Sequence, residues 1–63
     1  MRLRIRFNTK DLKISRLIFE FEDSIHGDAI HKAIAYLIEN DLIDESFYQA
    51  YSYCAIVQEI IEM

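Results

Sequence analysis

The sequence predicts a small α+β domain in which an N-terminal antiparallel β-hairpin (residues 1–23) precedes two helices packed on one face of the sheet. Three observations predict this ββαα order: strict alternation in residues 1–7, a helical apolar stripe in residues 28–40, and a mostly apolar stretch in residues 46–63. The 63 residues are 52% hydrophobic and 29% charged, so we expect one globular domain over residues 1–63. A domain this small often needs a second subunit, so we also expect dimerisation through the sheet edge or the last helix.

The first 23 residues have the pattern of two paired strands. Residues 1–7 alternate between two kinds of side chain: Leu3, Ile5 and Phe7, and Arg2, Arg4 and Arg6. In residues 12–23 the alternation changes parity, so we expect a β-bulge near Ser15 and Arg16. The best antiparallel register predicts three apolar pairs on one face: Leu3–Phe21, Ile5–Phe19 and Phe7–Leu17. It also predicts two charged pairs on the other face, Arg2–Glu22 and Arg4–Glu20.

Residues 28–40 are expected to form the first helix, with Asp28 as its N-cap. Its apolar residues recur at the spacing of one buried helix face: Ile30, Ala33, Ile34, Leu37 and Ile38. The second helix is expected over residues 46–63, where Ser46 and Gln49 have the spacing of a capping box.

At about 100° per residue, the second helix would turn one arc toward the core. The residues of this core arc are Phe47, Ala50, Tyr53, Cys54, Val57 and Ile61. The apolar residues that fall outside it include Tyr48, Tyr51, Ala55 and Ile56. Because tyrosine is enriched at protein interfaces, we expect these four residues to bind a protein partner, together with Arg6 of the first strand.

The sequence contains no pattern that predicts catalysis, a metal site or a cofactor. His26 and His31 lie five residues apart without a further ligand cluster, so we interpret them as loop and helix-flank residues. Cys54 is the single cysteine, which excludes an internal disulfide, and its place in the core arc favours a buried thiol over a nucleophile. The acidic residues in 41–45 fit capping positions better than a general acid–base pair. We therefore do not expect an enzyme.

The formal charge of −4 and a pI near 4.9 disfavour a general nucleic-acid-binding protein and favour a protein partner. A further hypothesis is that the acidic surface of the protein imitates the phosphates of a nucleic acid. The alternative is a dimeric β-ribbon that binds nucleic acid through Arg2, Arg4 and Arg6. In the predicted register Glu22 and Glu20 neutralise the first two arginines, which leaves Arg6 the least compensated.

We expect a cytoplasmic protein without a membrane segment, because no signal-peptide pattern and no apolar run of about 18 residues is present. The single cysteine agrees with a reducing compartment. Eleven isoleucines with one glycine and no proline suit an AT-rich bacterium or its phage. The composition and the surplus apolar surface together favour an inhibitor or regulator, encoded by a phage or mobile element, that binds its partner stoichiometrically.

The order of one strand and two helices in residues 16–23, 28–40 and 46–63 resembles the ribbon–helix–helix DNA-binding family. The resemblance implies a dimer whose paired strands enter the major groove with their outward residues, here Ile18, Glu20 and Glu22. Two features depart from that family: the acidic residues would face phosphates, and an additional strand precedes the ribbon. The resemblance therefore covers the order of the elements and does not extend to DNA binding.

Overall fold

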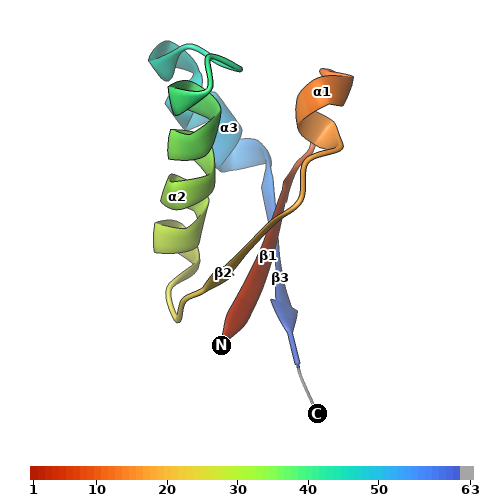
Figure 1. The fold of residues 1–63 in the computed structure, drawn as a ribbon, viewed down its shortest axis with the longest axis vertical. Coiled ribbons are helices and arrows are strands. Elements are labelled where there is room, and N and C mark those ends of the chain that lie inside the picture. Colours follow the sequence, from red (N-terminus) through yellow and green to blue (C-terminus); the bar gives the residue numbers. More distant parts are fainter. Residues whose placement is uncertain (62–63) are drawn as a thin grey trace.

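The computed structural model describes residues 1–61 and shows a three-stranded antiparallel sheet with its two longer helices on one side (Figure 1). The elements in chain order are β1 (Arg2–Phe7), α1 (Leu12–Ser15), β2 (Phe19–Glu22), α2 (His26–Glu39), the 3₁₀ helix η1 (Glu45–Phe47), α3 (Tyr48–Cys54) and β3 (Ala55–Ile60). The strands lie in the order β2-β1-β3, so the N-terminal strand is the central one. The α+β class is confirmed, whereas the predicted ββαα order is wrong.

The pairing of β1 with β2 follows the register predicted from the sequence. The observed pairs are Leu3–Phe21, Ile5–Phe19, Arg2–Glu22 and Arg4–Glu20. The predicted pair of Phe7 with Leu17 does not form, because β2 begins only at Phe19. The hairpin was predictable because the apolar and the charged pairs independently require the same register.

The change of parity between the two strands comes from a helical turn, so the predicted β-bulge near Ser15 and Arg16 is wrong. Leu12–Ser15 form α1, and the carboxylate of Asp11 caps it by accepting the Lys13 N–H at 3.0 Å. This turn places Ile14 in the core with 1% of its surface exposed. A short helix therefore buries the apolar residue that the sequence had suggested for a strand.

The largest departure from prediction is at the C-terminal end, where the expected helix over residues 46–63 ends at Cys54. Ala55–Ile60 form β3, which pairs antiparallel with β1 from Phe7–Ala55 to Arg2–Ile60; residues 62 and 63 of that prediction lie outside the described residues. β-Branched residues at 56, 57 and 60 pack well on a pleated sheet. The second edge of β1 supplies the backbone hydrogen bonds, so tertiary pairing outweighs the helical pattern.

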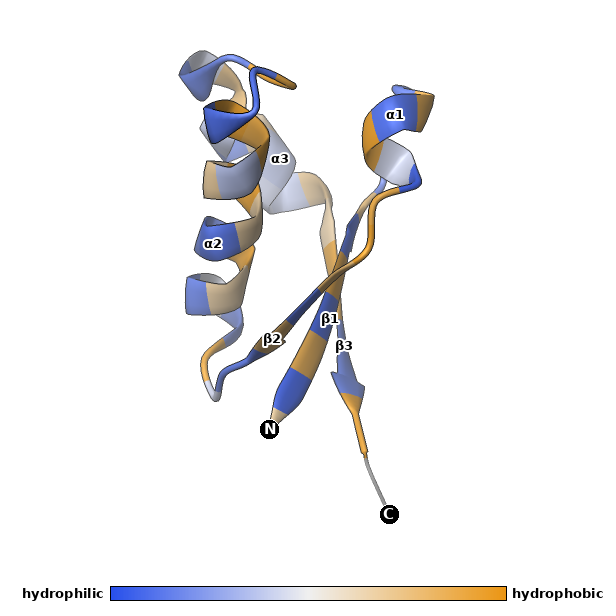
Figure 2. Ribbon diagram, viewed as in Figure 1, coloured by the Kyte–Doolittle hydropathy of each residue, from blue (hydrophilic) through white to orange (hydrophobic). Residues whose placement is uncertain are grey.

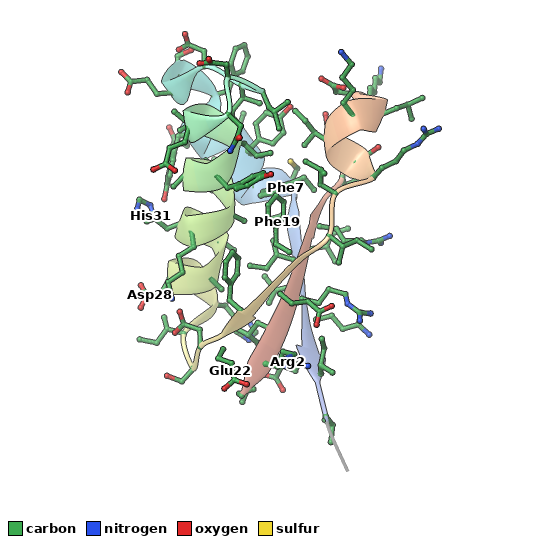
Figure 3. All side chains as sticks on the ribbon, in the orientation of Figure 1. Arg2, Phe7, Phe19, Glu22, Asp28 and His31 are labelled. Atoms are coloured by element: carbon green, nitrogen blue, oxygen red, sulfur yellow. The ribbon has the colours of Figure 1, made fainter. Side chains whose placement is uncertain are left out.

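The core lies between the sheet and α2, as Figure 3 shows for Phe7 and Phe19. Its fully buried residues come from β1, α1 and α2: Leu3, Ile5, Phe7, Ile14, Ala29, Ala33, Ile34 and Leu37. The buried face of α2 is rotated slightly from the predicted stripe, since Ala29 is buried while Ile30 and Ile38 are only half-buried. α2 also begins earlier than predicted, with Ile25 at the N-cap position and Asp28 inside the first turn.

Candidate protein-binding site

Two residues of the predicted partner surface, Tyr48 and Tyr51, pack against the core. The Tyr51 ring meets the Phe7 ring edge to face, with centroids 5.6 Å apart. The Tyr48 hydroxyl lies 2.8 Å from Nδ1 of His31 on α2, within hydrogen-bonding distance. The expectation that both tyrosines lie outside the core-facing side is therefore wrong, because the short α3 turns this side toward α2 and β1. Their role in partner binding stays a prediction.

The residues that the helical projection assigned to the core arc are largely on the surface. Tyr53 is 80% exposed, Phe47 54% and Ile61 85%. Cys54 is half-buried, and its thiol donates to the Tyr51 carbonyl oxygen at 3.5 Å. The projection assumed one continuous helix over residues 46–63. It does not apply from Ala55 onward, because the chain there is the strand β3.

Ala55 and Ile56, the other predicted contact residues, lie on opposite faces of β3. The pairing of Phe7 with Ala55 places Ala55 on the inner face, next to the core. The pairing of Arg6 with Ile56 places both of these side chains on the outer face, where Ile56 is 42% exposed. The structure therefore brings together two of the predicted site residues, Arg6 and Ile56, at a place that the sequence did not indicate.

The outer face of the sheet, which α2 and α3 leave uncovered (Figure 1), carries three columns of side chains. The columns are Glu20 and Glu22 on β2, Arg2, Arg4 and Arg6 on β1, and Ile56, Gln58 and Ile60 on β3. Figure 2 shows the alternation along β1 that separates the arginines from the buried residues. The outer face thus has an acidic side, a basic centre and a largely apolar side along β3.

The arginine column is only partly neutralised. A guanidinium nitrogen of Arg4 lies 3.6 Å from a carboxylate oxygen of Glu20, and both side chains are exposed, which makes a weak surface pair. Arg6 lies beyond the end of β2, so no acidic residue of that strand faces it. Arg6 forms no salt bridge with any residue in 1–61.

β3 leaves one edge without a partner strand among the described residues. The Asn8 N–H donates to the Cys54 carbonyl at 3.0 Å. This hydrogen bond shows which residues of β3 direct their backbone groups toward β1. In an antiparallel ladder the backbone groups alternate, so those of Ala55, Val57 and Glu59 point to the open edge. This edge presents a row of unpaired N–H and C=O groups.

The β3 edge lacks the usual protection of an exposed strand. Natural edge strands often carry lysine, proline or a β-bulge, which prevent pairing with another chain. Residues 55–60 contain neither lysine nor proline, their pairing with β1 is continuous, and Glu59 is their single charge. The other edge strand, β2, is shorter and carries Glu20 and Glu22. The β3 edge is therefore the better candidate for binding a strand.

The remaining polar clusters have structural explanations. Asp44 caps η1 by accepting the Ser46 N–H at 2.9 Å, and this hydrogen bond holds the pKa of its carboxyl below the ordinary value. His26 lies 3.4 Å from Glu59, and across residues 1–61 no group of three histidine, cysteine or acidic residues could hold a metal ion. Over the same part of the chain, no helix has the length and apolar character needed to cross a bilayer.

Comparisons with protein-family models, with curated protein sequences and with solved structures found no match to this chain. The case for a function therefore depends on the chain's own residues and geometry, chiefly on the open β3 edge and the outer face beside it.

Proposed function

We propose that the chain is a small acidic protein-interaction module that acts by stoichiometric binding, and that its β3 edge receives an extended strand of the partner. The observation that carries the proposal is the row of outward backbone groups of Ala55, Val57 and Glu59, bordered by exposed Ile56. In strand addition, backbone hydrogen bonds supply affinity, and the side chains beside the edge supply specificity.

The residues beside the edge can contribute to binding by the burial of apolar surface. Complete burial of an isoleucine is worth about 1.5–3 kcal/mol, so covering the 42% of Ile56 that is exposed contributes about 1 kcal/mol. Ile60 lies four residues further along the same face, beyond Gln58, and adds apolar surface there. The outward backbone groups gain partners, while the ladder with β1 is left intact.

The charge distribution supports a partner with a basic surface. Six of the seven basic residues lie in residues 1–16, so residues 17–63 carry ten acidic residues and one lysine. Complementary charge of this kind increases the rate of association with a basic partner. We propose an inhibitor or regulator of such a protein in the cytoplasm of a bacterium, encoded by a phage or mobile element.

The experiment that tests this function blocks the edge without opening the sheet. Because the Glu59 N–H points away from β1, Glu59→Pro removes one edge donor and leaves the β1–β3 hydrogen bonds in place. The matched control, Glu59→Ala, removes the carboxylate and keeps the N–H. We expect affinity capture from an extract of the source organism, with native mass spectrometry, to show a 1:1 partner for the wild-type chain and Glu59→Ala only. Equal capture by folded Glu59→Pro would contradict strand addition.

A second candidate function, a nucleic-acid-binding β-ribbon, is favoured by the uncovered arginine column and by Arg6 in particular. Phosphate binding by this column would weaken steeply with salt and would decrease in Arg6→Ala. Titration of mixed-sequence DNA and RNA at low and at physiological salt tests it. A lack of binding at low salt would exclude this function.

A further inference from the structure

We infer that, before a partner binds, the β3 edge pairs with β3 of a second copy, antiparallel about a twofold axis at Gln58. Two three-stranded sheets would then form one continuous six-stranded sheet. The inference rests on the proposed function, because it assigns an occupant to the same edge. Each possible register of two β3 strands brings a different set of side chains face to face.

The backbone phase limits the registers that two copies can adopt. The outward groups belong to Ala55, Val57 and Glu59, so these residues must pair with one another across the interface. The twofold axes that pair at least five of residues 55–61 in each copy pass at Val57, at Gln58 or at Glu59. An axis at Glu59 places the two carboxylates directly opposite each other, which is destabilising. An axis at Val57 sets each Ile56 opposite a polar Gln58.

The axis at Gln58 gives the best-matched pairs on the outer face. On the outer face, Ile56 of each copy faces Ile60 of the other, and the two Gln58 amides face each other and can exchange hydrogen bonds. On the inner face, Glu59 faces the uncharged Val57. The apolar columns of the two copies therefore merge into one cluster, and no like charges are placed opposite each other.

The same register also covers the exposed end of the strand. Continuing the pairing by one residue sets Ile61, which is 85% exposed, opposite Ala55 of the second copy. Because Ala55 borders the buried core, this contact places an exposed isoleucine against apolar surface. A second copy supplies both isoleucines at the required spacing, which an arbitrary strand would not.

The size of the contact predicts a concentration-dependent dimer. The pairing involves residues 55–61 of each copy, whereas a standard interface uses roughly 20–30 residues on each side. We therefore expect monomer at low concentration and dimer at high concentration. Light scattering after size exclusion should show the mean mass of the wild-type chain increasing with concentration, and Glu59→Pro remaining monomeric.

A disulfide at the axis tests the register directly. Residue 58 would face itself at a non-hydrogen-bonded position, where the Cα atoms are about 4.5 Å apart, within the range of a disulfide. We expect Gln58→Cys, in a Cys54→Ala background, to form a covalent dimer on mild oxidation. The matched control is Glu20→Cys, an outer-face position on the opposite edge of the sheet. Bridging of Gln58→Cys should be faster by on the order of tenfold or more, because the dimer holds its thiols together.

The outcomes separate this inference from the proposed function. A monomer at all concentrations, with Gln58→Cys bridging no faster than Glu20→Cys, would overturn the second copy as occupant. If Glu59→Pro still abolished capture of another protein, the proposed function would stand with that protein's strand at the edge. Faster bridging of Val57→Cys than of Gln58→Cys would overturn the register. Circular dichroism of Glu59→Pro checks that loss of dimer does not reflect loss of fold.

Discussion

Replacing Tyr51 by alanine tests the packing of α3 more sharply than any other single change. Its ring contacts Phe7 edge to face, at the junction of α3 with the central strand. We expect a large loss of stability from a residue that the helical projection of the sequence had placed on the surface.

The magnitude follows from the contacts that the ring makes. An aromatic side chain buries about 150–250 Å² when fully enclosed, so loss of a half-buried ring costs about 2–3 kcal/mol at 25 cal/mol per Å². The edge-to-face contact with Phe7 adds about 0.5–1.5 kcal/mol. The sum, about 2.5–4.5 kcal/mol, is a large part of the roughly 3–9 kcal/mol expected for the whole chain at this length.

The matched control is Tyr53→Ala, the same substitution two residues later in α3. Tyr53 is 80% exposed, and its hydroxyl accepts only a long hydrogen bond of 3.3 Å from Gln49. Its loss should change stability by no more than about 0.5 kcal/mol, and the gain in helix propensity is common to both variants. Urea unfolding followed by far-ultraviolet circular dichroism, at a concentration that favours the monomer, measures both. Greater destabilisation by Tyr53→Ala would refute the packing of α3 and support one continuous helix.

Three further changes test the core, the acid response and the outer face. Ile5→Ala removes a fully buried side chain of the central strand and should cost about 2–5 kcal/mol in urea unfolding. The ammonium of Lys32, 2.8 Å from Asp23, holds the pKa of the Asp23 carboxyl below its usual value of 3.8. The ionised carboxylate therefore stabilises the fold above pH 3.8, and this stabilisation is lost as the pH falls through the lower pKa of the folded state. The difference in melting temperature between wild type and Asp23→Asn should therefore shrink on acidification, and a constant difference would contradict this. A double-mutant cycle on exposed Arg4 and Glu20 should give at most about 1 kcal/mol of coupling.

The candidate site was only partly visible in the sequence. Arg6 and Ile56 were singled out for different reasons, and only the sheet places them side by side. The outward backbone groups of β3 were not indicated at all, because they depend on which edge of β1 the strand joins. The one available signal was the β-branched composition of residues 56–60, which competed with an equally good helical pattern.

The sequence by itself determined the parts of this protein in which local pattern and pairing agree. The register of β1 with β2 was predictable because apolar residues on one face and opposite charges on the other require the same alignment. α2 was predictable because its apolar residues recur at helical spacing, and the predicted ends of the helix agree with the observed ends to within about one turn.

Only the tertiary structure decided how the last third of the chain folds. Residues 46–63 carry enough apolar residues to satisfy either a helix or a strand. The periodicity of a sequence carries no information about the open edge of β1, which lies some fifty residues earlier in the chain. The second edge of β1 was open, and pairing with it satisfies the backbone of β3 while burying Ala55 and Val57 partly against the core. That pairing reversed which tyrosines of α3 are exposed, and it left β3 as the open edge on which the proposed function depends.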